Sequence, residues 1–179
     1  MFVYWRQCVG KWSDNLIVNG DFEQNACQSS WCIWNQPSTN VPGWIPSPEI
    51  EIGKATVYTN ALGSSWAAEL DPNANTCIKQ KINVKPGKHV LEFDWASRSG
   101  VIQPSNAFEV RINGQVLKSL APGDYNAHHE KIEFNLQSCP QDTYIEFCGA
   151  GQSDSLGAVI DNVQLFEYDE CASWSVLKC

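Results

Sequence analysis

Apolar and polar residues alternate along most of this chain, and this pattern constrains its fold more than any other feature. The alternation is clearest in residues 49–52, 91–95, 108–112 and 132–136. It is typical of β-strands with one buried face. Turn-forming pairs such as Pro42-Gly43, Pro86-Gly87 and Pro122-Gly123 separate these segments at the intervals expected of a β-sandwich. We therefore predict an all-β protein of two antiparallel sheets, without helices and with a tight hairpin turn at Asn113-Gly114.

The size and charge of the chain limit the kinds of partner that it is expected to bind. The chain has 179 residues, 43% of them hydrophobic, which suits one substantial domain with short extensions. Its net charge is −8 and its 12 lysines and arginines form no run, so we expect no nucleic-acid partner. No apolar stretch is long enough to cross a bilayer, and residues 1–8 lack the apolar region of a signal peptide. We expect no membrane insertion, with any signal removed or outside this sequence.

Cysteine usage points to an oxidising compartment. The eight cysteines are an even number without a C-x-x-C pair, which favours disulfides over a zinc site. We therefore expect a secreted or cell-surface protein. Cys27 and Cys32 are spaced for a local disulfide, and the other pairings stay open. They involve Cys8, Cys77, Cys139, Cys148, Cys171 and Cys179.

Two segments near the ends of the central region form a matched pair. Residues 15–23 read NLIVNGDFE, and residues 157–165 read GAVIDNVQL. They resemble the first and last strands of galactose-binding-like β-sandwiches that serve as carbohydrate-binding modules. Residues 42–44, 49–52, 67–71, 78–82 and 86–94 follow the strand order of these modules. The resemblance implies a jelly roll over residues 15–168, an N-terminal extension (1–14) with Cys8, and a Cys-bearing tail (169–179).

The same resemblance implies a metal site. In these folds the matched motifs bring Glu23 and Asp161 together as hard oxygen ligands of a structural calcium ion, beside the backbone carbonyl of Asp21. The alternative is that Asp161 caps a turn and Glu23 is a surface acid. We expect His128 and His129 to lie in a solvated loop over residues 121–130 rather than to bind metal, because adjacent residues of a strand face opposite ways.

Alternation also assigns residues to the core and to the outer face. We expect these side chains in the core: Trp66, Ala68, Leu70, Leu91, Phe93, Trp95, Phe108, Val110 and Ile112. The outward set is rich in charge: Glu49, Glu51, Glu69, Glu92, Asp94, Arg98, Glu109 and Arg111. Modules of the resembled type often bind glycans on such a face, where charged groups bond to sugar hydroxyls.

The predicted glycan contacts on that face are Glu51, Glu69, Asp94, Arg98 and Arg111. Two tryptophans in a Pro- and Asn-rich segment, Trp31 and Trp34, are alternative stacking platforms. A solvated face held by cross-strand ion pairs is the competing interpretation. Trp44, after Pro42-Gly43, is expected to plug one end of the sandwich.

Catalysis is not expected. The sequence has no Gly-x-Ser-x-Gly, His-Glu-x-x-His or phosphate-loop motif. Glu92 and Asp94 offer two carboxylates, as glycoside hydrolysis requires, but similar pairs recur on other strands with nothing to raise one pKa selectively.

Two functional classes remain open. The first is a non-catalytic, lectin-like carbohydrate-binding module with a structural calcium ion and a glycan or polysaccharide partner. The second is a subunit of an extracellular assembly, joined to copies of itself or to other proteins through its Cys-bearing ends.

Overall fold

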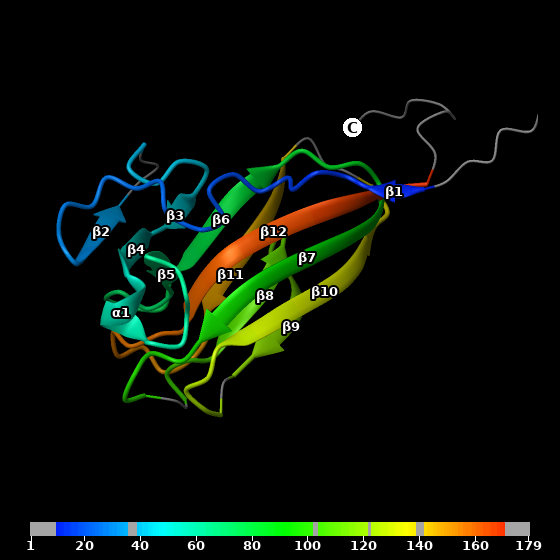
Figure 1. The fold of residues 1–179 in the computed structure, drawn as a ribbon. Coiled ribbons are helices and arrows are strands. Elements are labelled where there is room, and N and C mark those ends of the chain that lie inside the picture. Colours follow the sequence, from blue (N-terminus) through cyan, green and yellow to red (C-terminus); the bar gives the residue numbers. More distant parts are fainter. Residues whose placement is uncertain (1–9, 36–38, 102–103, 122, 139–141, 171–179) are drawn as a thin grey trace, which may run out of the picture.

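Two antiparallel β-sheets packed face to face form the molecule, as predicted (Figure 1). The computed structural model describes residues 10–35, 39–101, 104–121, 123–138 and 142–170. In the first sheet the order is β10 (His128–Leu136), β7 (Gly87–Ala96), β12 (Val159–Asp169), β5 (Trp66–Glu69), β4 (Glu49–Lys54) and β2 (Trp31–Asn35), and β1 (Lys11–Trp12) also pairs with β12. The second sheet has the order β3 (Ile45–Ser47), β6 (Cys77–Ile82), β11 (Thr143–Gly149), β8 (Phe108–Ile112) and β9 (Gln115–Leu120).

The core lies between the sheets and contains the residues that alternation predicted. All nine predicted core residues belong to it, with Trp66 partly buried and the others buried. Trp44 is buried against Phe22 and Phe147, and its indole Nε1 donates to the carbonyl of Asn19 at 2.9 Å. Its predicted role as a plug is therefore consistent with its contacts. The hairpin prediction is confirmed, because Asn113 and Gly114 join β8 to β9 with φ angles of 48° and 78°.

The two matched segments lie side by side. The amide of Leu16 donates to the carbonyl of Leu165 at 2.8 Å, and the amide of Val163 donates to the carbonyl of Gly20 at 2.9 Å. Residues 15–23, all within the described part of the chain, nevertheless form no strand. Their partner is β12, and β1 extends the paired region to Lys11 opposite Asp169.

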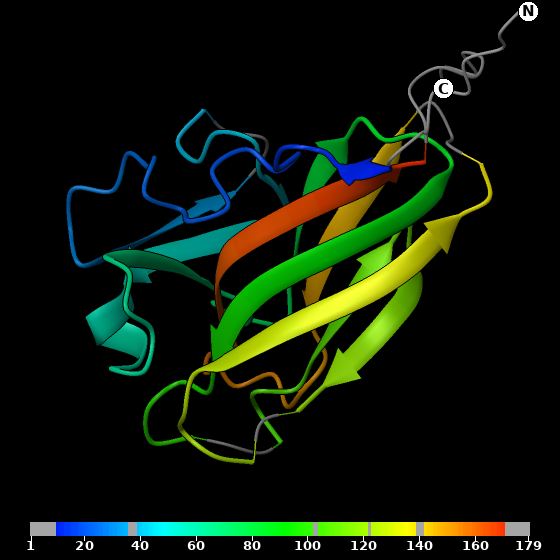
Figure 2. The same cartoon turned by 45° about the vertical axis from the view of Figure 1, so that its right-hand side comes forward.

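One short helix departs from the all-strand expectation. Helix α1 (Ala55–Tyr58) begins the connection between β4 and β5, which we call the lid (residues 55–65) (Figure 2). Lid residues Tyr58 and Leu62 pack in a small apolar cluster with three buried residues of the sheet, Ala67, Ala96 and Val159. The neighbours Ala68, Trp95 and Ile160 belong to the main core. Because successive residues of a strand face opposite sides, the lid covers the outer face of the first sheet.

Two disulfides are present among the described residues. The predicted Cys27–Cys32 bridge is confirmed, and Cys77–Cys148 joins β6 to β11 in the second sheet. The other four cysteines, Cys8, Cys139, Cys171 and Cys179, lie outside the described residues. In the described part of the chain, no helix is long and apolar enough to cross a membrane.

Candidate functional site

An open pocket on the outer face of the first sheet brings together the three residues predicted to bind metal. Its volume is about 500 Å³, and Asp21, Glu23 and Asp161 all line it. The remaining lining residues are Ala61, Leu62, Gly63, Ser64, Asp94, Ala127, His128, His129 and Asn162. The pocket therefore lies where the lid, β7, β10 and β12 meet the matched segment near residue 20.

Asp161 is the most deeply placed acid of this pocket. Its exposed fraction is 4%, and it faces Asp94 directly across the β7–β12 pair. Burial raises the pKa of Asp161 to about 6, and the negative charges of Asp94 and Glu23 act in the same direction. A β-bulge follows between Asp161 and Gln164, with Asn162 at a φ of 49°. A cation near Asp161 would relieve this unfavourable accumulation of negative charge.

Glu23 links the matched segment to the end of the lid. Its Oε1 accepts hydrogen bonds from the amides of Ser65 at 2.9 Å and Trp66 at 3.1 Å. Carboxylate and carbonyl oxygens are the ligands that calcium prefers, so Glu23, Asp161 and the carbonyl of Asp21 fit this ion chemically.

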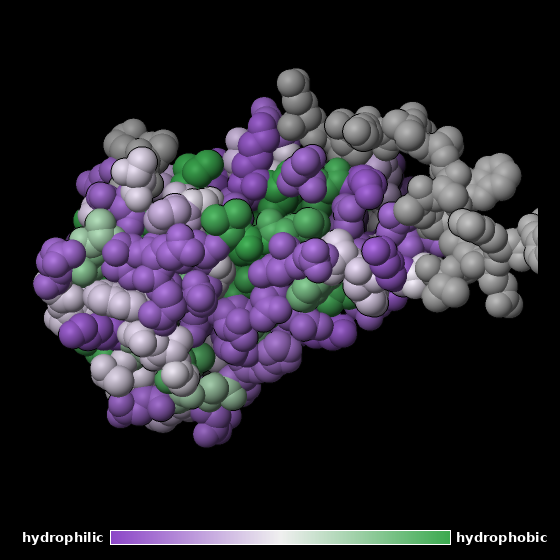
Figure 3. Space-filling view, turned by 45° about the horizontal axis from the view of Figure 1, so that its top comes forward, coloured by the Kyte–Doolittle hydropathy of each residue, from purple (hydrophilic) through white to green (hydrophobic). Residues whose placement is uncertain are grey.

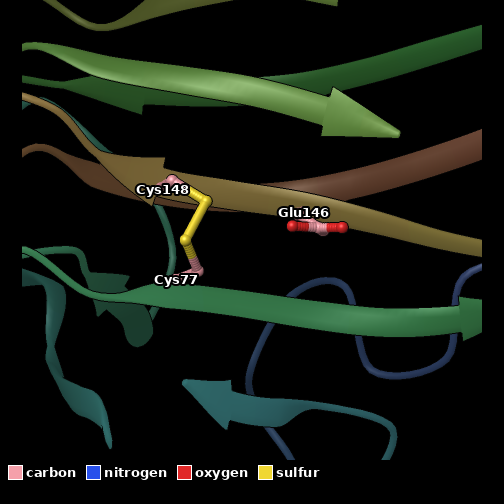
Figure 4. Close-up of side chains that lie close together, drawn as sticks. All are labelled: Cys77, Glu146 and Cys148. Carbon is pink, nitrogen blue, oxygen red and sulfur yellow. A yellow bond between two sulfur atoms is a disulfide. The ribbon is translucent and has the colours of Figure 1, made fainter. Parts of the chain in front are cut away.

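A second group of ligand-type atoms lies on the other sheet. Ligand atoms of Cys77, Glu146 and Cys148 lie within 4.8 Å of one another (Figure 4). Both sulfurs form the Cys77–Cys148 disulfide and cannot act as thiolate ligands in this state. Among the described residues this is the one such group of three, so the carboxylates of Asp21, Glu23 and Asp161 are not gathered as closely. A calcium ion in the pocket would therefore rely on carbonyl or water ligands as well.

Asp94 is the centre of a hydrogen-bond network on the pocket floor. His129 Nδ1 lies 2.8 Å from Asp94 Oδ1, and the side-chain Nδ2 of Asn162 donates to Asp94 Oδ2 at 3.0 Å. His128 instead stacks on Trp95, with ring centroids 4.6 Å apart. The two histidines begin strand β10, so their predicted placement in a loop was wrong. Both of them line the pocket.

A second pocket, also of about 500 Å³, adjoins the first. The two share Ala61 and Ala127, and together we call them the loop groove. The described residues that line the second pocket are uncharged: Thr59, Asn60, Ala61, Ser99, Tyr125, Asn126 and Ala127. Tyr125 is a large hydrophobic residue with an exposed fraction of 49%. Hydroxyl and amide groups beside an accessible aromatic ring match the hydroxyls and apolar faces of sugars.

Sequence reasoning missed this second pocket. The available signal was a single aromatic residue, Tyr125, among turn-forming and small polar residues of the segment 121–127. Alternation carries no information about which loops converge, so Ser99 and Thr59 could not be joined to Tyr125 from the sequence.

Two predicted glycan contacts are inaccessible. Glu51 and Glu69 have exposed fractions of 5% and 0%, because the lid covers their part of the sheet. The Tyr58 hydroxyl donates to Glu51 Oε1 at 2.9 Å. Burial raises the pKa of Glu69 to about 8, and the facing Glu51 charge contributes further. The expectation that these two carboxylates lie on an open face is therefore wrong.

The predicted charged face is also divided between the two sheets. Asp94 lines the loop groove, whereas Arg98 donates to the carbonyl of Ser155 at 3.2 Å beside the buried acids. Arg111 lies on β8 in the second sheet and pairs with Glu109 at 2.7 Å. A single glycan-binding face that includes Arg111 is therefore wrong, because alternation fixes inward and outward sides but not the sheet.

The two predicted tryptophan platforms differ in exposure. Trp31 is 47% exposed on β2, whereas Trp34 is partly buried against the core. Trp31 remains a predicted platform at the edge of the first sheet.

Comparison with known proteins gives sequence relatives in two toxins. No protein-family model matches the chain. It is 32% identical over 154 residues to the multifunctional-autoprocessing repeats-in-toxin proteins of Vibrio cholerae serotype O1 and Vibrio vulnificus. The match covers 83% of this chain and 3% of each toxin, so the chain spans a small part of these relatives.

Solved structures share the fold. A family 16 carbohydrate-binding module has a TM-score of 0.54 at 17% identity, over 84% of this chain and 99% of the module. TmCBM61, determined in complex with β-1,4-galactotriose, also has a TM-score of 0.54, at 15% identity over 87% and 99% of the two chains. The arabinose-bound α-L-arabinofuranosidase MgGH51 reaches 0.57 at 15% identity, over 86% of this chain and 26% of the enzyme. The protein thus has the jelly-roll architecture of carbohydrate-binding modules.

Proposed function

We propose that this protein is a non-catalytic, lectin-like carbohydrate-binding module that holds a glycan in the loop groove. The observation that carries the proposal is the second pocket, which neutral hydroxyl and amide side chains line together with the exposed Tyr125. Sugars are bound by this combination, because their hydroxyls need hydrogen-bond partners and their C–H faces stack on aromatic rings. Asp94 and His129 add polar contacts at the adjoining pocket.

The fold supports the same proposal. Two carbohydrate-binding modules match over 99% of their own length, and one of them was determined with a bound galactotriose. Fold alone does not determine function, so the groove has to carry the assignment.

We further propose a structural calcium ion at Glu23, Asp161 and the carbonyl of Asp21. The support is that these residues line one pocket, that Asp161 is buried, and that further acids lie close by. The ion would neutralise these charges and fasten the matched segment to β12 in the first pocket of the groove.

Absence of catalysis remains part of the proposal. Both oxygens of Asp94 are engaged by His129 and Asn162, and the raised-pKa pair Glu51 and Glu69 is buried beneath the lid. Neither arrangement offers two accessible carboxylates on opposite sides of a substrate bond.

An extracellular location is proposed from the disulfides. Cys27–Cys32 and Cys77–Cys148 are both formed, and disulfides persist in oxidising surroundings. The relatives named as toxins are consistent with such a setting.

The alternative, a subunit of an extracellular assembly, has a separate observation in its favour. An exposed Trp12 packs against Tyr168 at a centroid distance of 5.0 Å, where β1 pairs with the end of β12. Figure 3 shows mainly hydrophilic side chains on one face of the molecule, with a hydrophobic area near its centre. Apolar areas of this kind often mark contacts between proteins.

A glycan-array screen tests the main proposal. We expect the protein to bind a restricted set of neutral glycans in calcium, and to bind them more weakly in chelator. Binding to none of the glycans, together with covalent multimers on a non-reducing gel, would instead support the assembly.

A further inference from the structure

Two buried carboxylates lie directly opposite each other beneath the lid. Glu51 on β4 and Glu69 on β5 are partners in the strand register, and both point to the outer face that the lid covers. Neither acid lines the loop groove. Like charges in this position repel each other strongly when solvent is excluded.

Within the described part of the chain, one guanidinium compensates the pair. Arg98 Nη1 lies 3.8 Å from Glu69 Oε1 and is the cation that lowers the pKa of both acids. Backbone amides of Asp71 and Gly157 also donate to Glu69. Glu49, the first residue of β4, adds negative charge near Glu51.

The carboxylate of the nearby Asp71 is engaged elsewhere. It accepts hydrogen bonds from the Ser153 hydroxyl and from the amides of Asp154 and Ser155. Among the described residues, two buried acids therefore face one arginine, with Glu49 adding further negative charge, and one retained proton reduces this imbalance.

The lid is anchored to this pair through Tyr58. The Tyr58 hydroxyl donates to Glu51, and the guanidinium of Arg98 lies 5.3 Å from the centre of the tyrosine ring. The carbonyl of Tyr58 accepts the amide of Ser99 at 2.7 Å. Gly53 leaves room for the Tyr58 ring, because a side chain at this position would overlap the Tyr58 hydroxyl.

The residues that follow Tyr58 form one wall of the loop groove. Thr59, Asn60 and Ala61 line the second pocket, and residues 61–64 line the first. Ser99, which holds the carbonyl of Tyr58, also lines the second pocket. The position of the groove wall therefore depends on how firmly Tyr58 is held.

We infer that a proton retained by the Glu51 and Glu69 pair keeps the lid closed, so that its loss in mildly alkaline solution loosens the lid and weakens glycan binding. The glycan part of this inference rests on the proposed function. Release of the proton to solvent leaves two carboxylates for one guanidinium, and their repulsion acts directly beneath Tyr58. The raised pKa of Glu69, about 8, puts this transition just above neutral pH.

Hydrogen exchange of the lid amides tests the switch without any glycan. Protection of residues 59–64, corrected for the intrinsic pH dependence of exchange, is measured at about pH 6 and about pH 9, one unit or more on either side of the transition. We expect protection in the wild-type protein to fall by about tenfold or more. In Glu69→Gln, whose side chain at this position cannot ionise, protection should fall by less than about twofold, which we take as the measurement error.

Glu92→Gln is the matched control. Glu92 lies on β7, which β12 separates from β5, and pairs with Lys131 at 3.0 Å. This variant should behave like the wild type. Equal loss of protection in Glu69→Gln and in the wild type, or no loss in either, would overturn the switch.

Two further measurements distinguish a failure of the proton switch from a failure of the proposed glycan-binding function. In the wild type, carboxyl NMR should show Glu69 titrating well above its ordinary pKa, and a normal value would refute the inference even if Glu69→Gln does not fold. Glycan affinity should fall between the two pH values in the wild type but not in Glu69→Gln. A lid that loosens without any glycan binding at either pH would retain the switch and reject the proposed function.

Discussion

Asp94 on β7 and Asp161 on β12 are directly opposite each other, and both line the same pocket. Like charges at facing positions of a sheet destabilise it, and the burial of Asp161 increases the cost. His129 on β10 and Asn162 on β12, the two strands that flank β7, each hydrogen-bond to one oxygen of Asp94. The structure thus concentrates negative charge at a point where a bound cation would stabilise the fold.

Calcium should therefore stabilise the wild-type protein. An ion bound by the folded state alone adds about 2.7 kcal/mol at a hundredfold excess over its Kd. We expect the Tm to rise in calcium and to fall in chelator, with the fold retained because the core and disulfides persist.

Asp161→Asn is the corresponding variant. It removes a ligand and also the repulsion with Asp94, so its Tm in chelator should match or exceed that of the wild type, and calcium should not change it. Glu92→Gln should respond to calcium as the wild type does. A calcium response in Asp161→Asn equal to that of the wild type would exclude this site.

Glu69→Gln should alter how stability depends on pH. The folded-state pKa of Glu69, about 8, lies above its ordinary value of 4.5, so the folded protein retains a proton that the unfolded chain releases. The stability from this proton is complete below about pH 4.5 and is lost as the pH rises to about 8, by at most about 1.4 kcal/mol per unit. Denaturant unfolding at several pH values should show that the free energy of unfolding of Glu69→Gln increases relative to that of the wild type across this pH window. Parallel stability curves would contradict the prediction.

The two disulfides should contribute unequally. Cys77–Cys148 spans 71 residues and Cys27–Cys32 spans 5, so the first constrains the unfolded chain far more. Chain-entropy reasoning gives about 4 kcal/mol for the long loop and about 2 kcal/mol for the short one. Denaturant unfolding of the paired Cys→Ala variants should reproduce this order. A larger loss from removal of Cys27–Cys32 would show that native-state contacts outweigh loop length.

Tyr125→Ala and Trp31→Ala distinguish two aromatic platforms of similar exposure. Stacking on an aromatic ring contributes about 1 kcal/mol or more, so we expect Tyr125→Ala to weaken glycan binding by about fivefold or more. Titration calorimetry with a glycan identified in the screen would measure this. If Trp31→Ala weakens binding and Tyr125→Ala does not, the ligand binds at the β2 edge and the loop groove is not its site.

The fold was predictable because it depends on local periodicity. Phe93, Val110 and Ala68 were assigned to the core from alternation alone, and Asn113-Gly114 carries its own turn preference. The lid was not predictable in this way. A four-residue helix has no detectable periodicity, and its packing on Ala67 and Val159 is a long-range contact.

The site was predictable only where the resemblance to galactose-binding-like modules linked residues that are distant in the sequence. It linked Glu23 to Asp161, and both residues line one pocket, whereas their role as calcium ligands stays a prediction. Alternation marked Glu51 and Arg111 as outward. Glu51 is nevertheless buried beneath the lid, and Arg111 lies on the other sheet. Such placements depend on sheet order and on loop packing, which periodicity does not encode.

The central claim is that a glycan binds in the loop groove. NMR chemical-shift mapping of the calcium-loaded protein during titration with a glycan from the screen tests it most directly. We predict that the shifted amides cluster at residues 59–64, at Ser99 and at residues 125–129, around the two adjoining pockets. Saturable shifts confined to the outer face of the second sheet or to the β2 edge, with the groove amides unchanged, would contradict the account.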